Sequence, residues 1–285
     1  MAADTLPMKH RRSSFWRGCR SAFRAALAVV MGEECVVCGR PLVGAGVCGD
    51  CWLRLPYTRL QGAVGNEIER LFWAEPRVER VSAFLVYKPE YKIAALVHAF
   101  KYHGRRDLAC LMGRAMTRDL KATDFFDGID AILPVPLSDR RQRRRGYNQS
   151  EALAEGVAEV LSLPVISTAV KRVVDNPSQT SLDPTERTEN VKNIFALADA
   201  AALENKRILI VDDVITVGAT LLSLVRTLEG IRGLRIRILA LCAAGTYRRG
   251  RVSEHDLGLP DLTAHYDPSA VRRYPAEERK TTPLL

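Results

Sequence analysis

The stretch that most constrains how this chain folds covers residues 207–220 and reads RILIVDDVITVGAT. Residues 208–211 are branched and apolar without polar alternation, which predicts a strand buried on both faces of a parallel sheet. Asp212 and Asp213 follow directly, at the carboxyl end of this strand, where ligands bind in open α/β sheets. Because buried carboxylates cost free energy unless they have partners, we expect this pair to hold hydroxyl groups, a cation, or both.

A loop suited to phosphate binding comes after the acidic pair. Its residues are Thr216, Val217, Gly218, Ala219 and Thr220. The apolar residues beyond it recur at helical spacing, so the loop leads into the amino end of a helix. Backbone N–H groups in such a loop and the positive end of the helix dipole attract phosphate. The alternative, a buried strand followed by a solvated acidic turn, does not require this order of residue types.

The composition allows one sizeable core and a small accessory module, because 47% of the 285 residues are hydrophobic. The formal net charge of +9 predicts attraction to anions, which include phosphate ligands, nucleic acid and acidic proteins. No window reaches the length of a transmembrane helix, so we expect no stable membrane insertion and a cytoplasmic location.

Residues 1–31 are basic, and their apolar side chains recur at helical intervals. This pattern predicts an amphipathic helix that packs on the module that follows it. A secretory signal is the alternative. The apolar part is too short to span a bilayer, and no convincing cleavage site follows it, so the sequence favours the amphipathic helix.

Two CxxC pairs separated by nine residues indicate a structural metal site with the candidate ligands Cys35, Cys38, Cys48 and Cys51. Each CxxC turn can direct two thiolates to one centre, and four thiolates satisfy tetrahedral Zn²⁺. Residues 32–60 contain too few apolar side chains to fold alone, so zinc binding would be coupled to folding. Two disulfides or a redox CxxC are the alternatives, and the lack of a secretion signal and of a thioredoxin-like context disfavours both.

A second strand is expected over residues 129–135, and an arginine-rich segment follows it. Prolines at the end of this strand stop the ladder and stiffen the turn. Five of the six residues 140–145 are arginines, whose guanidinium groups pair with phosphate oxygens, so this segment is a candidate anion site. Asn148 or Ser150 is the expected N-cap of the next helix.

Other segments complete the expected α/β pattern. Residues 78–87 and 236–243 read as strands, the latter beside the strand at 208–211. Two helices are expected between the first of these strands and residue 120. His98 and His103 near the end of the first helix are candidate acid/base groups, but partly exposed helix histidines are the simpler interpretation. Residues 171–195 form a polar segment too long for a simple connection, which predicts a functional lid.

These segments together resemble the ComF family, amidophosphoribosyltransferase-like proteins linked to DNA uptake in competent bacteria. The similarity covers roughly residues 32–244, and its most specific parts read RGYNQSE (145–151) and VDDVITVGAT (211–220). It also includes the CxxC pairs, a Lys-Tyr-x-Gly segment at 101–104 and the sequence PVPLS at 134–138. The resemblance implies an α/β fold in which helices flank a type I phosphoribosyltransferase-like parallel sheet, preceded by a small double zinc ribbon.

The resemblance also implies a site for phosphoribosyl pyrophosphate (PRPP) with Mg²⁺. Asp212 and Asp213 would hold the ribose hydroxyls with Mg²⁺ nearby, and residues 216–220 would wrap the 5′-phosphate. Val217 departs from the commoner threonine, so one side-chain donor is missing. The pyrophosphate would lie near Ser138, Arg140, Arg144 and Arg145, and the flexible loop would carry Arg172, Gln179, Arg187 and Asn190.

The expected domains are the N-terminal helix (1–31), the zinc ribbon (32–60), the phosphoribosyltransferase-like domain (77–245) and a polar, disordered tail (246–285). Two functions stay open. The first is transfer of a phosphoribosyl group to an unknown acceptor, for which no general base is evident. The second is a non-catalytic PRPP sensor or a module that binds single-stranded DNA, a competence helicase or another DNA-processing protein. Surplus arginines at 141, 143 and 145 favour the second function, but no aromatic residues interleave with them to stack on bases.

Overall fold

The computed structural model describes residues 33–42, 46–60, 62–88, 93–174 and 194–244, all within one unit of the chain. Several predictions from the sequence therefore lie outside the described residues. They are the N-terminal helix, the loop residues Gln179, Arg187 and Asn190, and the tail from 246. The predicted division into domains likewise stays a prediction.

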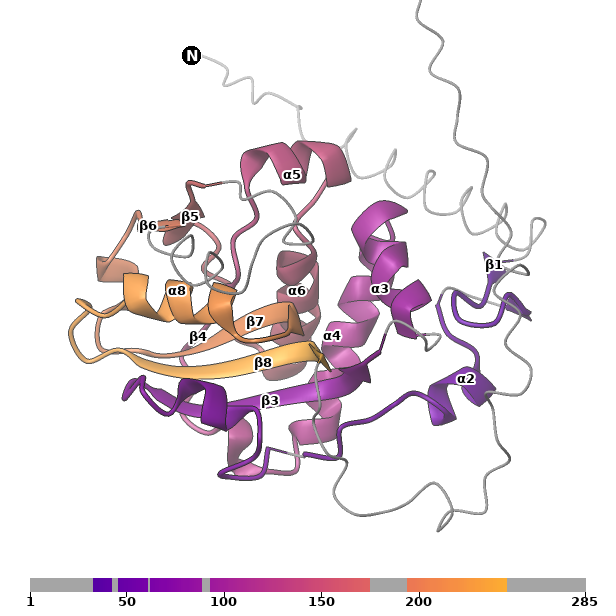
Figure 1. Cartoon of the computed structure of the whole chain (residues 1–285), viewed down its shortest axis with the longest axis horizontal. Helices are drawn as coiled ribbons and strands as arrows, with labels where there is room; N and C mark the ends of the chain where they lie inside the picture. The colour runs from indigo at the N-terminus through magenta and orange to yellow at the C-terminus, as the bar shows by residue number, and fades with distance from the viewer. Residues whose placement is uncertain (1–32, 43–45, 61, 89–92, 175–193, 245–285) are drawn as a thin grey trace, which may run out of the picture. The chain divides into compact units, whose positions relative to one another are not determined.

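A four-stranded parallel sheet forms the centre of the fold (Figure 1). Its strands lie in the order β3 (Val78–Tyr87), β8 (Arg235–Ala244), β7 (Arg207–Ile215) and β4 (Ala131–Pro134). The apolar residues at 208–211 are buried, as a run without polar alternation predicts. The expected parallel sheet flanked by helices is confirmed.

Strand β7 is longer than predicted and carries the acidic pair inside it. It remains paired with β8 as far as Ile215, whereas β4 ends where Pro134 lies opposite Val211. The last hydrogen bond on the β4 side runs from Val135 N to Val211 O over 3.0 Å. Because Pro134 and Pro136 have no N–H to donate, the ladder stops there. Asp212 and Asp213 therefore lie just beyond the end of the neighbouring strand.

Alternating side chains of the central strands fill two cores. Leu209 and Val211 pack with helices α3 (Ile93–Tyr102), α4 (Arg106–Leu120) and α6 (Gln149–Leu161). Ile208 and Ile210 pack with α8 (Ala219–Thr227) on the other face. The period of two in a strand sends successive side chains to opposite faces, so one short apolar run supports both layers. The two helices expected before residue 120 and the one after the phosphate loop are confirmed.

Three short 3₁₀ helices lie in the described part of the chain. They are η1 (Glu69–Phe72), η2 (Asp124–Phe126) and η4 (Ala201–Leu203). The residue Phe72 of η1 packs in the same core as α8. Within the described part of the chain, no helix combines the length and apolarity that crossing a membrane requires.

The sequence did not predict two further features, a short helix and a two-stranded ribbon. The arginine run folds into a short helix, α5 (Asp139–Arg145), because Ser138 accepts a hydrogen bond from Arg141 N at its start and Gly146 ends it at φ +83°. Strands β5 (Val170–Arg172) and β6 (Phe195–Leu197) pair antiparallel. This ribbon brings together the chain on either side of the predicted lid.

The cysteine-rich module comprises the antiparallel pair β1 (Glu33–Glu34) and β2 (Pro41–Leu42) and the helix α2 (Gly49–Leu53). Its apolar residues Val36, Val47 and Trp52 pack against the core formed by α3, α4 and α6. The chain then runs along the edge of β3, where Thr58 N donates to Phe84 O over 3.0 Å. This small module fits the predicted zinc ribbon.

Candidate functional site

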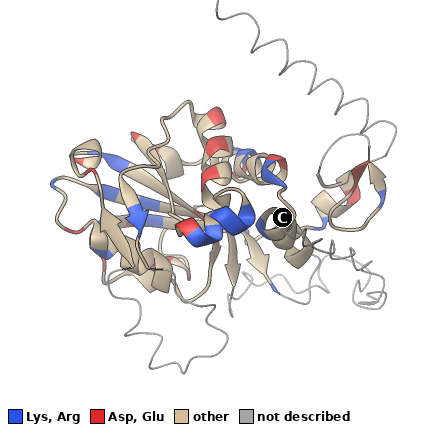
Figure 2. Cartoon of the chain, turned by 90° about the horizontal axis from the view of Figure 1, so that it is seen from above, with Lys and Arg blue, Asp and Glu red and all other residues tan. Residues whose placement is uncertain are grey.

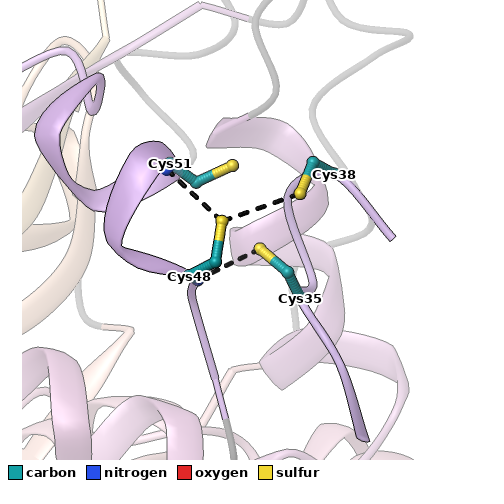
Figure 3. Close-up of side chains that lie close together, drawn as sticks. All are labelled: Cys35, Cys38, Cys48 and Cys51. Atoms are coloured by element: carbon teal, nitrogen blue, oxygen red, sulfur yellow. Dashed lines mark hydrogen bonds between the residues drawn. The ribbon is translucent and has the colours of Figure 1, made fainter. Parts of the chain in front are cut away.

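The four predicted cysteine ligands form one cluster, with sulfur atoms that all lie within 4.8 Å of one another (Figure 3). Cys48 precedes α2 as its N-cap, and its sulfur accepts a hydrogen bond from Cys51 N at 3.5 Å. Cys48 N in turn donates to the sulfur of Cys35 at 3.3 Å. The prediction that the two CxxC turns meet at one point is confirmed.

The chemistry of the cluster fits a metal such as zinc. All four cysteines are free of disulfide bonds, and Cys35 and Cys48 are buried. Burial alone would raise the pKa of Cys35, but hydrogen bonds from backbone N–H groups outweigh it and lower that pKa to about 7. A thiolate is the form that binds metal, and four sulfur donors at mutual contact distance suit tetrahedral Zn²⁺.

The acidic pair lies at the buried end of β7. Ser150 Oγ donates to Asp212 Oδ1 over 3.0 Å, and Asp213 N donates to the same oxygen over 2.8 Å. Burial and the neighbouring Asp213 carboxylate raise the pKa of Asp212 to about 7. Asp212 is buried and Asp213 half-buried, so the two carboxylates form a shielded acidic site with fixed orientation.

Lys101, which the sequence did not mark as a site residue, completes this cluster. Its Nζ lies 2.8 Å from Asp213 Oδ2. Burial would lower the pKa of Lys101, but the Asp213 and Asp212 carboxylates outweigh it and raise that pKa. The available signal was a lysine in the last turn of a predicted helix, at the start of the Lys-Tyr-x-Gly segment.

The predicted phosphate loop links β7 to α8. Thr216 and Val217 are exposed, and Gly218 is the N-cap of α8 with φ +76°, a left-handed conformation that favours glycine. Gly218 supplies no side-chain acceptor to the first turn, whose first backbone bond runs from Leu222 N to Gly218 O. Ala219 and Thr220 are half-buried in that turn. The loop thus presents a helix N-terminus near the strand that holds the acidic pair.

The predicted anion-binding residues occupy different places. Ser138 is buried as the N-cap of α5, whereas Arg140 and Arg144 are exposed on that helix, where basic residues gather (Figure 2). Arg145 lies near Lys101: its positive charge acts to lower the pKa of Lys101, and it donates to Gln149 Oε1 over 2.7 Å. Its Nε is buried and has no hydrogen-bond partner among the residues that the structure describes. A buried donor of this kind is a place where a ligand oxygen can bind.

The remaining candidates lie at the edges of the site. Arg172 on β5 stacks over the ring of Phe195 at 5.6 Å and donates to Val174 O over 3.2 Å, at the base of the predicted lid. His98 is exposed and packs at a tilt against Tyr102, with 5.1 Å between ring centroids. His103 is also exposed. Neither histidine is buried with the acidic pair, which agrees with the simpler interpretation of both.

Comparison with known proteins bears on this arrangement. The family model for the phosphoribosyl transferase domain matches residues 124–267, which include the acidic pair, the phosphate loop and α5. Competence protein F of Haemophilus influenzae is 31% identical over 226 residues, which cover 78% of this chain and 95% of that protein. The chain belongs to the ComF family. The resemblance inferred from the motifs and the phosphoribosyltransferase-like fold class are therefore both confirmed.

Other relatives of this ComF-family chain carry related names. DNA utilization protein YhgH of Escherichia coli K12 is 28% identical over 223 residues, covering 77% of this chain and 94% of that protein. Competence protein ComFC of Bacillus subtilis is 28% identical over 201 residues, covering 70% and 72%. These similarities extend beyond the phosphoribosyl transferase domain, because they cover more of the chain than the family model does.

Proposed function

We propose that this ComF-family protein binds PRPP with Mg²⁺ at the carboxyl ends of β7 and β4, and transfers its phosphoribosyl group to an acceptor in a process tied to DNA uptake. One observation carries the proposal. Asp212 and Asp213 are fixed by Ser150 and Lys101 where β4 stops, on the strand that leads into the loop capping α8. Carboxylates accept hydrogen bonds from sugar hydroxyls, and a helix N-terminus binds phosphate.

The acidic pair has acceptor capacity left for a ribose. Each carboxylate offers two oxygens with about four lone-pair sites in total. Asp212 accepts hydrogen bonds from Ser150 and from the Asp213 N–H, and Asp213 accepts one from Lys101. The remaining sites can take the 2′ and 3′ hydroxyls of the sugar. These contacts support the assignment of both residues to the ribose.

The 5′-phosphate would bind the loop of residues 216–220. The turn at Gly218 aims backbone N–H groups and the positive end of α8 at the ligand, and this arrangement does not depend on the side chain at 217. Val217 is 69% exposed, so its lack of a hydroxyl removes one side-chain donor without changing the backbone cradle. The departure from threonine is therefore compatible with phosphate binding.

The pyrophosphate would lie near Arg145, with Ser138, Arg140 and Arg144 at the start and outer face of α5. The Nε of Arg145, which has no partner within the described residues, supports this placement, because its N–H can donate to a phosphate oxygen. Mg²⁺, when bound beside Asp212 and Asp213 with the oxygens of PRPP, would neutralise charge on the leaving group.

Transfer would require little covalent chemistry from the protein. Departure of pyrophosphate leaves positive charge at C1 of the ribose, so the chain accelerates the step by orienting the sugar and by stabilising charge on the leaving group. The acidic pair orients the ribose, and the arginine side chains of α5 stabilise the departing pyrophosphate. The acceptor would then attack C1 from the opposite face.

Calorimetric titration of PRPP with Mg²⁺ tests the proposal. We expect one site per chain in the wild type and at least about a tenfold loss of affinity in Asp213→Asn, because a charged acceptor of a sugar hydroxyl is lost. Asp127→Asn is the matched control, since Asp127 is an exposed carboxylate before the amino end of β4. Release of pyrophosphate in the presence of a panel of bases and amines then tests turnover.

A second candidate function is a binding module for single-stranded DNA. The exposed arginines of α5 favour it, and relatives are named DNA utilization proteins. Arg145 no longer counts toward such a surface, because it contacts Gln149 and Tyr102 beside the acidic pair. Salt-dependent binding of single-stranded DNA that is unchanged in Arg143→Ala/Arg144→Ala would argue against this surface. In this second function the chain would also bind a competence helicase or another DNA-processing protein, and it would act in the cytoplasm.

A further inference from the structure

Lys101 forms an ion pair with Asp213 that is largely shielded from water. The Nζ–Oδ2 distance is 2.8 Å, and the two side chains are 20% and 15% exposed. A pair this buried interacts more strongly than a surface salt bridge, and removing one partner leaves an uncompensated buried charge. Lys101 therefore has more influence on the acidic pair than an ordinary surface lysine would.

The end of α3 holds Lys101 in place. Its neighbour Phe100 is fully buried, and the Tyr147 hydroxyl donates to the Phe100 carbonyl. Two backbone N–H groups beyond the helix, those of His103 and Arg105, donate to Ala99 O over 3.0 and 3.4 Å. Because these contacts fix the backbone on both sides of Lys101, its ammonium group has a defined position beside β7.

In the described part of the chain, Lys101 is also the cation in direct contact with the pair. The other titratable or charged groups that act on Lys101 and Asp213 come from β7, α5, the turn before α6 and β8: Asp212, Arg145, Tyr147 and Cys242. Of these, Arg145 is positive but donates to Gln149. Without Lys101, the Asp213 carboxylate would lie uncompensated close to that of Asp212, for which Ser150 and a backbone N–H are the described donors. Mutual repulsion would then turn Asp213 away from Asp212.

We infer that Lys101 is a positioning residue for the ribose site: its ammonium group fixes one oxygen of Asp213, so that the rest of the carboxylate faces the sugar hydroxyls. The inference rests on the proposed binding of PRPP. Ser150 plays the matching part for Asp212, so that each carboxylate is held by one side chain from a different helix. The competing role for Lys101 is direct contact with the pyrophosphate.

Two ligands separate these roles, because ribose 5-phosphate has the sugar and the phosphate of PRPP but no pyrophosphate. We expect Lys101→Met to weaken the Mg²⁺-supported binding of both ligands by a similar factor of at least about ten. A loss confined to PRPP would overturn the inference in favour of a pyrophosphate contact. Unchanged affinity for both ligands would also overturn it. Lys121→Met, at an exposed lysine after α4, controls for the loss of one positive charge.

A double-mutant cycle tests whether Lys101 acts through Asp213. We expect Lys101→Met to add no further loss of affinity once Asp213→Asn is present, whereas additive losses would overturn the inference. Lys101→Arg should restore part of the affinity, because it keeps the charge and a donor. If Lys101→Met does not fold, as judged by thermal unfolding, Lys101→Gln takes its place in both experiments with the same expected results.

The outcomes also distinguish the two levels of the proposal. A wild-type chain that binds neither PRPP nor ribose 5-phosphate overturns the proposed function and the role of Lys101 with it. Wild-type binding that Lys101→Met leaves unchanged overturns only the role of Lys101. The positioning role is supported if Lys101→Met weakens the binding of both ligands by a similar factor and adds no further loss of affinity in the Asp213→Asn background.

Discussion

Ser150, near the start of α6, donates its hydroxyl hydrogen to Asp212 Oδ1 over 3.0 Å and so connects the helix after the arginine run to the buried end of β7. The contact is possible because Asn148 caps α6, with its side-chain oxygen accepting from Ser150 N over 3.1 Å. One helix N-terminus therefore fixes both its own first turn and a carboxylate of the site.

Ser150→Ala tests this contact. We expect weaker PRPP binding and a loss of about 1–3 kcal/mol in the free energy of unfolding, because a buried carboxylate oxygen loses a donor. Calorimetry and chemical denaturation measure the two effects. Ser167→Ala, at an exposed serine, should change neither quantity. Wild-type affinity in Ser150→Ala would show that the hydroxyl does not orient Asp212.

The close contact of α4 and α6 yields a prediction about packing. A Cβ on Gly113 would lie 2.1 Å from Leu153 O, which is backbone and cannot rotate away. Gly113→Ala should therefore push the helices apart and reduce the free energy of unfolding by about 1–3 kcal/mol or more, as seen for overpacked cores. Gly230→Ala is the control, because no atom lies within 4 Å of its Cβ position. Equal stability of the two variants would contradict this packing.

Glu79 on β3 predicts how stability depends on pH. It pairs with Arg207 of β7 and with Arg235 and Arg237 of β8, so these ion pairs connect three neighbouring strands. Burial would raise the pKa of Glu79, but these guanidinium groups outweigh it and lower that pKa. Because the folded pKa lies below the unfolded one, the stabilisation is present above the usual pKa of 4.5 and is lost as pH falls through the folded pKa.

Glu79→Gln should therefore be less stable than wild type at pH 7, by about 1–2 kcal/mol after allowance for solvent screening, and the gap should close in acid. Chemical denaturation measures this difference in stability between about pH 3 and 7, which brackets the usual pKa of a glutamate. Glu229→Gln, at an exposed glutamate, provides the baseline. A gap that stays constant with pH would contradict the ionic origin of the effect.

Removal of metal should affect the cysteine module first. We expect one zinc per chain by elemental analysis, lost in Cys48→Ser and kept in Cys110→Ser, since Cys110 lies outside the cluster. A chelator should then expose Trp52, which packs on the core formed by α3, α4 and α6, and shift the fluorescence of this tryptophan. Trp52→Phe assigns that signal. Purified wild-type protein without stoichiometric zinc would refute the structural role of the metal.

The parts of the fold that were predictable depend on local patterns. The apolar run at 208–211, the CxxC spacing and the helical periodicities each fix an element from neighbouring residues alone. The length of β7 was underestimated because pairing continues with β8 past the acidic pair, a tertiary effect. The arginine run was predicted only as an anion site, because a charged sequence gives no amphipathic signal for helix α5.

The site was predictable where its residues are contiguous. The acidic pair and the phosphate loop lie within one short stretch, so their order alone indicated a shared ligand. Lys101 was missed because α3 brings it to Asp213 from a distant part of the chain, and a single lysine near a helix end has no distinctive pattern. Arg145 was indistinguishable from its neighbours until its buried Nε and its contact with Gln149 set it apart.

A crystal structure of the chain with PRPP and Mg²⁺ tests the proposed function most directly. We predict that the ribose hydroxyls bind Asp212 and Asp213, that the 5′-phosphate contacts the backbone of residues 216–220, and that the pyrophosphate reaches Arg145. A ligand bound elsewhere would contradict the proposal. So would a site that stays empty at saturating PRPP, with the carboxylates of Asp212 and Asp213 paired to arginine side chains.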